Sequence, residues 1–366
     1  MDNTASLPAD QFIDLLLRLP PDLDLDALAR QTKAIQRKRK IGTGANLLRL
    51  ALARGPGGLS LSQTAAWAAL LGFARLSDPG VKFRLDNAVG FLDAVLAGQL
   101  AAKSAGASVR WAGRILRACD GTCISQRAST GTDWRVHAVY DLGRGGFAHL
   151  ELTDKHGAEA IDRGAPISGE IRIGDRNYAT AASLHRFRQQ SAMQADFIVR
   201  ARWRGFILSR TDGTNFNLIN YLGTLADDRV VHDVMVQAKL GPLDPPLPLR
   251  LIIQRKTPEA TEATRRKLHA AASRKQKTLD PRSLVAAEFM ILATSLPDTA
   301  YPAEEVLSVY RLRWQIELAF KRLKSQLHID RLPTRTEQAS RSWLTAHLIL
   351  ALLCDDLSQE FLESSP

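Results

Sequence analysis

Three carboxylates lie in sequence contexts in which they could bind metal ions. Asp120 interrupts the apolar run "RACDGTCIS", Asp175 lies in "EIRIGDRNYA", and Glu317 is the one acid of "YRLRWQIELAFKRLK". Taken singly, Asp120 fits an Asp-Gly turn and Asp175 fits a turn cap. Three carboxylates at one place repel each other, however, and hard divalent cations prefer oxygen ligands. Together they predict a site for two Mg²⁺ ions, for which Mn²⁺ can substitute, at the oxygens of a phosphoryl transfer.

The segment around Glu317 has helical periodicity, and four of its polar residues share one stripe. Tyr310, Arg313, Glu317 and Lys324 fall within about 60° of one another at 100° per residue. The adjacent stripe is apolar and is predicted to face a core; it contains Val309, Leu312, Ile316, Ala319, Phe320, Leu323 and Leu327. The polar stripe can be an ordinary surface with an Arg313–Glu317 pair that contributes about 0.3 kcal/mol. It can also place Glu317 at a metal and the basic residues at a polyanion.

Composition favours a polyanionic partner. The chain has 366 residues, a formal charge of +11 and 45% hydrophobic residues, enough for two or three domains with real cores. It has no apolar run near the roughly 18 residues of a membrane span and no signal-peptide pattern at its start. We therefore expect a cytoplasmic, nucleoid-associated protein that meets DNA or RNA and no membrane. Three cysteines, Cys119, Cys123 and Cys354, offer half a zinc site without a second pair of ligands.

Residues 1–105 are predicted to be helical. One helix is expected over 61–71, followed by a turn at Gly72 and a second helix that starts near Ser77 or Asp78, with Asp78 as N-cap. Two short helices around such a turn have the outline of a helix-turn-helix, which would make this part a DNA-binding domain. A small helical bundle without groove contacts has the same pattern, and the positive charge of the chain favours DNA.

From about residue 106 the pattern changes to a mixed α/β sheet. Strands are predicted in "RILRACDGTCIS", "DWRVHAVYDL", "FAHLELTD", "GEIRIGDRNYA" and "DFIVRARW", with helical stretches at "AEAIDRG" and "AASLHRFRQQSA". This order places Asp120 on the first strand, Asp175 at the end of the fourth and Glu317 on a later helix that faces the sheet. A ribonuclease-H-like sheet gathers three carboxylates in this way.

Residues 204–285 interrupt that sheet and are predicted to be rich in β-structure. Strands are expected in "GFILSR", "FNLINYLGTL", "VVHDVMVQAKL" and "LPLRLIIQRK", followed by a basic helical segment. Residues 286–366 then return to the catalytic core with the strand "EFMILATSL", one long helix that starts near Pro302, and a last helix over about 340–363. The predicted catalytic core therefore combines 106–203 with 286–366.

The spacing Y-x2-R-x3-E-x6-K, from Tyr310 to Lys324, resembles the YREK signature of DDE transposases from the fourth family of bacterial insertion sequences. "CDGTCIS" and "GDRNYA" resemble the two acidic motifs of that family. The N-terminal "LSQTAAWAALLGFARLSD" is also similar, so the likeness covers most of the chain. The resemblance implies a ribonuclease-H-like core with a β-rich insertion. It also implies cut-and-paste transposition, in which transposon-end inverted repeats and target double-stranded DNA are bound and two metal ions assist strand cleavage and transfer.

The resemblance also implies roles for single residues. Asp120, Asp175 and Glu317 would bind the metals and carry catalysis. The predicted DNA-binding residues are Tyr310, Arg313, Lys324, Lys321, Arg200 and Arg202. The two last-named alternate with Arg204 in "IVRARWRG", so they could share one strand face along the DNA channel or form a solvated edge.

Two features depart from the family pattern. Some relatives stack an aromatic residue of the insertion on a flipped base; Phe289 lies near the corresponding place, where tryptophan is expected. Some relatives also carry a larger C-terminal dimerisation region. The chain of 366 residues leaves 366 − 324 = 42 after Lys324. A homodimer on DNA would then use the last helix, the N-terminal domain or the DNA itself, unless the copy is truncated.

Other functions remain open on the sequence. A haloacid-dehalogenase-type "DGT" motif needs an Asp two residues before Asp120, where Ala118 stands, so that class is excluded. Another ribonuclease-H-like nuclease, such as a resolvase, lacks the YREK helix and the long insertion. A catalytically inactive or domesticated, sequence-specific DNA-binding derivative would keep binding but not the acidic triad.

Overall fold

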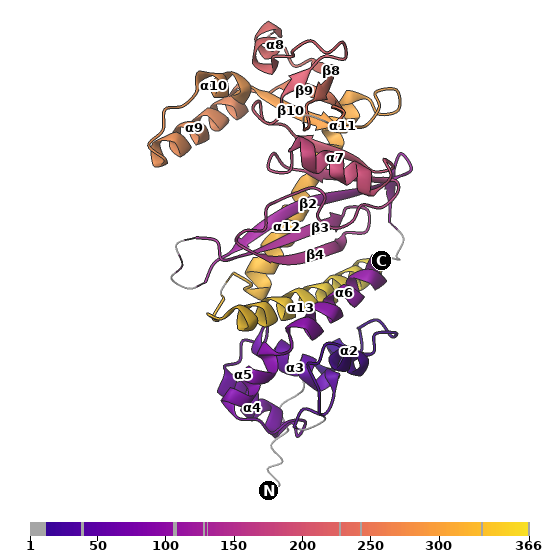
Figure 1. Cartoon of the computed structure of the whole chain (residues 1–366), viewed down its shortest axis with the longest axis vertical. Coiled ribbons are helices and arrows are strands. Elements are labelled where there is room, and N and C mark those ends of the chain that lie inside the picture. Colours follow the sequence, from indigo (N-terminus) through magenta and orange to yellow (C-terminus); the bar gives the residue numbers. More distant parts are fainter. Residues whose placement is uncertain are drawn as a thin grey trace.

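A mixed ten-stranded sheet connects most of the molecule, in the order β4-β3-β2-β5-β6-β10-β9-β8-β7, with β1 paired on β2 (Figure 1). The computed structural model describes residues 12–37, 40–104, 108–126, 129, 131–226, 228–241, 244–330 and 332–364. The strands are β1 Arg110–Trp111, β2 Arg114–Ile124, β3 Trp134–Asp141, β4 Gly146–Asp154, β5 Glu170–Gly174, β6 Asp196–Arg200, β7 Leu208–Ser209, β8 Val231–Ala238, β9 Leu247–Arg255 and β10 Phe289–Thr294. Among the described residues, no helix is both long and apolar enough to cross a membrane.

Helices pack at both ends and on the faces of this sheet. They are α1 Ile13–Leu16, α2 Leu25–Gln31, α3 Gly44–Arg54, α4 Leu61–Leu70, α5 Asp78–Asp86, α6 Val89–Ser104, α7 Ala181–Gln190, α8 Leu218–Thr224, α9 Pro258–Arg274, α10 Pro281–Ala287, α11 Ala303–Tyr310, α12 Trp314–Leu327 and α13 Glu337–Ser364. In Figure 1, α2 to α6 form the lower end, and α9 with α10 form an arm beside the upper strands.

Strands β2, β3 and β4 form an antiparallel meander, and β5 and β6 run parallel to β2 and to each other. This order confirms the mixed α/β class predicted from the sequence. The predicted helix at "AEAIDRG" is wrong, because the Arg172 guanidinium takes up its carbonyl groups. One nitrogen of Arg172 donates to the carbonyl oxygens of Ile161, Arg163 and Gly164 at 2.7–2.8 Å, so they do not close helical turns.

The interrupting segment extends the same sheet. Strand β10 pairs antiparallel with β6, β9 pairs with β10, and β8 pairs with β9. The strand predicted at "FNLINYLGTL" is wrong: residues Leu218–Thr224 form α8, because the Asn217 side chain caps the helix by accepting from the Asn220 amide at 3.1 Å. Residues 204–285 therefore contain helices as well as strands.

At the N-terminal end, α4 and α5 flank the turn predicted at Gly72, which has a φ of +75°. The N-cap of α5 is Ser77, not Asp78. The Ser77 hydroxyl accepts from the Gly80 amide at 3.4 Å, and Asp78 lies in the first turn, where its charge favours the helix dipole.

The last helix, α13, lies beside α6 between the sheet and the N-terminal helices (Figure 1). Asp93 on α6 accepts a hydrogen bond from Thr345 at 3.2 Å and lies 3.4 Å from the Arg341 guanidinium. A continuous apolar cluster joins these helices to α12 and to the β3–β4 side of the sheet. The C-terminal helix therefore connects the N-terminal helices to the sheet.

The long helix predicted from Pro302 onward is divided in two. Helix α11 ends at Tyr310, a 3₁₀ turn covers Arg311–Arg313, and α12 begins at Trp314. The predicted apolar stripe is nevertheless on the inside: Val309, Ile316, Ala319, Phe320 and Leu323 are buried. Helix α12 packs across β2 and thereby carries its polar stripe to the strand that bears Asp120.

Candidate active site

Asp120 lies on β2, and Asp175 follows directly after the neighbouring parallel strand β5. Ala118 of β2 pairs with Ile173 of β5, so two residues further along each chain stand Asp120 and Asp175. Side chains two residues apart point to the same face, and neighbouring strands are about 4.8 Å apart. The strand register therefore brings both residues to the same end of this strand pair, where the Asp175 carboxylate accepts from the Asn177 amide at 2.6 Å.

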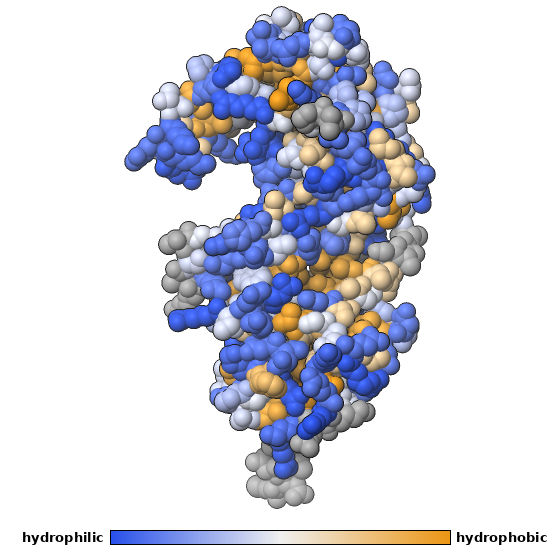
Figure 2. Space-filling view, viewed as in Figure 1, coloured by the Kyte–Doolittle hydropathy of each residue, from blue (hydrophilic) through white to orange (hydrophobic). Residues whose placement is uncertain are grey.

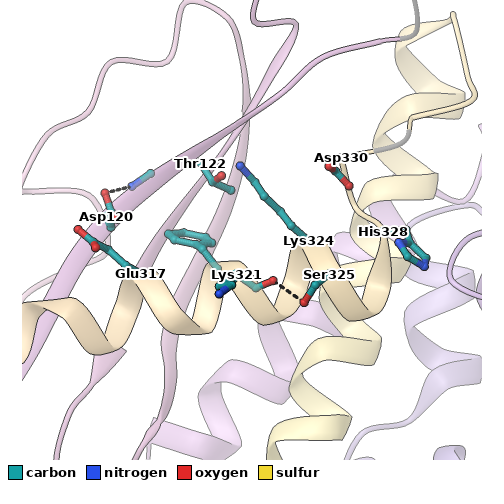
Figure 3. Close-up of a pocket in the computed structure, with 10 residues that line it drawn as sticks. Asp120, Thr122, Glu317, Lys321, Lys324, Ser325, His328 and Asp330 are labelled. Carbon is teal, nitrogen blue, oxygen red and sulfur yellow. Dashed lines mark hydrogen bonds between the residues drawn. The ribbon is translucent and has the colours of Figure 1, made fainter. Parts of the chain in front are cut away.

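Glu317 reaches the same face from α12. Asp120 and Glu317 lie side by side at one end of a cavity of about 650 Å³ (Figure 3). From the same helix, Lys324 extends over the cavity towards Thr122, and Lys321 also lines it. The structure thus brings together Asp120, Glu317, Lys321 and Lys324 at one cavity, whereas Asp175 is not among the residues that line it. It adds Thr122, Ser325, His328 and Asp330, of which the last two follow the YREK helix in "QLHID" but were overlooked.

The environment of Asp120 makes its charge unfavourable. Burial raises the pKa of Asp120 to about 6. The Gly121 amide, which donates to the carboxylate at 2.9 Å, and the charge of Arg313 oppose that rise, whereas Asp175 and Glu317 add to it. Asp175 and Glu317 are therefore both close enough to influence the charge of Asp120.

Glu317 is paired with a cation. The guanidinium of Arg313 lies 2.5 Å from the Glu317 carboxylate, whose side chain is 53% exposed. Tyr310 lies on the inner side of this pair and is only 8% exposed. Burial raises the pKa of Tyr310 to about 12, against the opposing charges of Arg313 and Arg200. Hence Arg313 links the buried tyrosine to the open carboxylate.

The donor set suits a hard cation, because all three side chains offer carboxylate oxygens. A divalent ion would also relieve the repulsion that raises the pKa of Asp120. In the part of the chain that the structure describes, no three His, Cys, Asp or Glu side chains are already gathered closely enough to hold an ion. Arg313 engages one oxygen of Glu317, so this ion pair competes with an ion for that oxygen.

A second cavity, of about 200 Å³, lies beyond Arg200. Arg176, Arg200 and Lys256 line it. Burial lowers the pKa of Lys256 to about 8, and the charges of Arg200 and Arg176 lower it further. Lys256 was missed by the sequence analysis, because a single lysine after a strand carries no distinctive pattern.

The arginines of "IVRARWRG" do not share one strand face, because β6 ends at Arg200. Arg202 and Arg204 follow in the next loop, where they bond to Asn177 and Asp280 respectively. All three arginines nevertheless line the second cavity. The three arginines therefore gather at one cavity, but the end of a strand and the loop after it bring them together, not one strand face.

The position of Phe289 argues against the predicted stacking role. Its side chain is 3% exposed, and the Arg255 guanidinium lies 4.5 Å from the ring centroid. The more open aromatic residue of this cavity is Trp203, which lies between Arg204 at 4.3 Å and Arg282 at 4.7 Å. Trp203 stands in a basic run that was singled out for its arginines, and the tryptophan itself was overlooked.

Comparison with known proteins gives consistent results. Residues 111–353 match the family described as the transposase DDE domain. The chain is 38% identical over 363 residues to the transposase for insertion sequence element IS421 of Escherichia coli, a match that covers 98% of this chain and 96% of that protein. It is 26% identical over 241 residues to the transposase for insertion sequence element IS231F of Bacillus thuringiensis subsp. israelensis, covering 60% and 49% respectively. A piggyBac transposase synaptic complex with hairpin DNA superposes with a TM-score of 0.43 at 9% identity, covering 87% of this chain and 64% of that chain.

Proposed function

The chain belongs to the DDE transposase family, and on that premise we propose that Asp120, Asp175 and Glu317 are the carboxylates of its catalytic centre. It is a DNA transposase of an insertion sequence, an enzyme that cleaves DNA and transfers strands in a metal-dependent reaction. The observation that supports this assignment is that Asp120 and Glu317 line one cavity, while Asp175 follows directly on the strand that pairs in parallel with the strand of Asp120. Two neighbouring strands and a helix thus bring the three residues into the same region.

We propose that these carboxylates hold two Mg²⁺ ions, for which Mn²⁺ can substitute. Bound ions of this kind supply Lewis-acid chemistry, because they neutralise charge on the phosphoryl oxygens during an in-line displacement. The protein's own contribution is positioning: Asp120 is fixed by the Gly121 amide, and the basic residues around the cavity hold the strand. No side chain needs to act as nucleophile.

In the free protein, the ion pair with Arg313 holds the Glu317 carboxylate and opposes its binding to a metal ion. In the absence of DNA, the guanidinium neutralises the carboxylate. A DNA phosphate that takes Arg313 as its own partner would release Glu317 towards Asp120. Arginine binds phosphate through two parallel hydrogen bonds, so the exchange replaces one charge-assisted contact by another. Engagement of DNA and completion of the metal site are coupled in this proposal.

The DNA path follows the cations around the two cavities. Lys321 and Lys324 line the first cavity, and Arg200 and Arg202 line the second. Figure 2 shows a hollow, with a mainly hydrophilic rim, between the arm of α9 and α10 and the body formed by the lower strands. We place double-stranded DNA along this hollow, with Tyr310 supporting Arg313 from behind. The chain's net charge of +11 favours the same partner.

We also propose roles for the larger parts of the chain. We assign the β4-β3-β2-β5-β6 half of the sheet to a ribonuclease-H-like core, residues 204–285 to an insertion, and α4–α5 of residues 1–105 to a helix-turn-helix-like DNA-binding domain. The enzyme would act by cut-and-paste transposition on transposon ends and target DNA, as a homodimer. Its place of action would be the cytoplasm, at the nucleoid.

A strand-cleavage assay on DNA that carries the element's own terminal repeats tests the assignment. Asp120→Asn, Asp175→Asn and Glu317→Gln are each expected to abolish Mn²⁺-dependent cleavage while binding to the same DNA persists. Asp298→Asn, at an exposed position, is the matched control and should cleave normally. Full cleavage by any of the three variants would contradict the assignment. Binding without cleavage by the unmodified chain would favour the DNA-binding derivative.

A further inference from the structure

Tyr178 connects the two strands that carry the aspartates. Its side chain packs against Gly174, where an added Cβ would lie 2.9 Å from Tyr178 Cβ and 3.2 Å from its Cγ. Its hydroxyl reaches Gly121, where an added Cβ would lie 3.5 Å from the oxygen. Gly174 immediately precedes Asp175, and Gly121 immediately follows Asp120. The tyrosine therefore spans the distance between the backbones of both carboxylate-bearing residues.

This contact lies on the far face of the sheet. Side chains alternate along a strand, so Gly121 points to the face opposite Asp120, as Gly174 does relative to Asp175. A Cβ at position 174 would press on the tyrosine, and a Cβ at position 121 would crowd the Glu159 side chain at 3.1 Å while only touching the tyrosine hydroxyl. The aromatic ring therefore supports the aspartates from behind without occupying the cavity in front of them.

The hydroxyl of Tyr178 is buried without a partner. The residue is 2% exposed, and its oxygen has no hydrogen bond within the described part of the chain. A buried hydroxyl that lacks a partner destabilises the fold, and phenylalanine would fill the same space without that penalty. A buried hydroxyl without a partner calls for an explanation, and a state of the protein in which it makes a hydrogen bond supplies one.

A fourth carboxylate, Glu159, lies beside this hydroxyl. The Cβ position of Gly121 is 3.1 Å from Glu159 Oε1 and 3.5 Å from Tyr178 Oη, so both groups adjoin the same point behind Asp120. Glu159 is half-buried in the loop after β4, and none of the residues described here forms an ion pair or hydrogen bond with its side chain. An acceptor and a donor, both without a partner, thus adjoin the backbone that carries the catalytic aspartate.

We propose that Tyr178 is a positioning residue for the Asp120–Asp175 pair, and that its hydroxyl acts together with the Glu159 carboxylate when the site holds its cations. The inference rests on the proposed role of the two aspartates as metal ligands. Groups behind metal ligands fix their orientation, and their loss commonly weakens metal binding by about 10- to 100-fold. In the cation-bound protein, the Glu159 carboxylate accepts the hydrogen bond that the Tyr178 hydroxyl does not make in the ion-free protein.

Two measurements test the proposal. Calorimetry in the presence of transposon-end DNA gives the affinity for Mn²⁺, and thermal unfolding of the ion-free protein gives its midpoint temperature. Tyr178→Phe is expected to weaken Mn²⁺ binding by about tenfold or more while the unfolding midpoint stays the same or rises. Glu159→Gln should weaken binding similarly. The double variant should lose little more than either single variant, because both side chains serve one linkage.

Two matched variants serve as controls. Tyr221→Phe removes a tyrosine hydroxyl and Glu262→Gln removes an exposed carboxylate, both within the insertion, and neither should change Mn²⁺ binding. Mn²⁺ affinity in Tyr178→Phe equal to that of the unmodified protein would overturn the proposal, and so would a loss of affinity matched by a fall in the unfolding midpoint. Asp120→Asn distinguishes a failure of the proposed metal site from a failure of the positioning role. If this variant binds Mn²⁺ normally, the proposed metal site is wrong. If it loses Mn²⁺ binding while Tyr178→Phe does not, only the positioning role of Tyr178 is wrong.

Discussion

Replacing the carboxylate of Asp120 should make the ion-free protein more stable. Burial and the neighbouring acids raise the pKa of Asp120 from the ordinary 3.8 to about 6 in the folded protein. The folded state then binds the proton more tightly than the unfolded chain, so the charge of Asp120 opposes folding above pH 6. The difference in pKa corresponds to about 3 kcal/mol of unfolding free energy at pH 8. Asp120→Asn removes this charge and keeps an oxygen that can accept from the Gly121 amide.

The pH dependence distinguishes this electrostatic effect from a packing effect. Asp120 is charged in both states above pH 6 and neutral in both below 3.8. The stability gained by Asp120→Asn should therefore be full at pH 8, fall by roughly half by pH 5, and vanish as the pH falls to about 3. Urea unfolding in a chelating buffer at several pH values measures it, and the exposed Asp298→Asn serves as control. A variant that is no more stable than the parent at pH 8, or whose advantage does not change with pH, would refute the reasoning.

Three further predictions concern the cations around the site. Arg313→Met removes the partner of Glu317, so Mn²⁺ affinity in the absence of DNA should rise several-fold and depend less on added DNA by calorimetry; unchanged affinity would exclude the proposed exchange. Lys324→Ala should lower the slope of log K against log salt by about one, measured by fluorescence anisotropy with DNA, and an unchanged slope would remove Lys324 from the phosphate contacts. Arg172→Met removes the ion pair of buried Glu170 at 2.6 Å, leaves only Arg117 at 3.4 Å, and takes the donor away from three carbonyl oxygens. Urea unfolding should therefore show a loss of about 3 kcal/mol, and a neutral result would contradict the structural role of Arg172.

The catalytic half could be predicted well because its signals are local. The apolar run around Asp120 and the end of the predicted strand near Asp175 indicate two strands, and their parallel pairing brings both residues into the same region. The helical stripe of Glu317 needs only its own periodicity to be oriented. The resemblance to insertion-sequence transposases of the fourth family is confirmed by the comparisons.

The features that escaped prediction depend on contacts between distant segments. No proline or glycine marks the break of the helix after Tyr310 in the sequence. The packing of α13 against α6 brings together segments from opposite ends of the chain. The loop before Arg172 looks helical in sequence, but a guanidinium from the next strand takes its carbonyl groups. The side chains of Tyr178 and Glu159 both come close to Gly121, and no spacing of residues in the sequence predicts this.

The central claim is that Asp120, Asp175 and Glu317 hold metal ions together, and iron-directed cleavage of the polypeptide tests it directly. Fe²⁺ replaces Mg²⁺ in the DNA-bound enzyme, and ascorbate with peroxide then generates hydroxyl radicals that cut the nearby backbone, with the cuts mapped by mass spectrometry. The account predicts cuts at three places far apart in the sequence, next to Asp120, Asp175 and Glu317, and competition by excess Mg²⁺. Cuts beside only one of these residues, or a pattern that Asp120→Asn leaves unchanged, would contradict it.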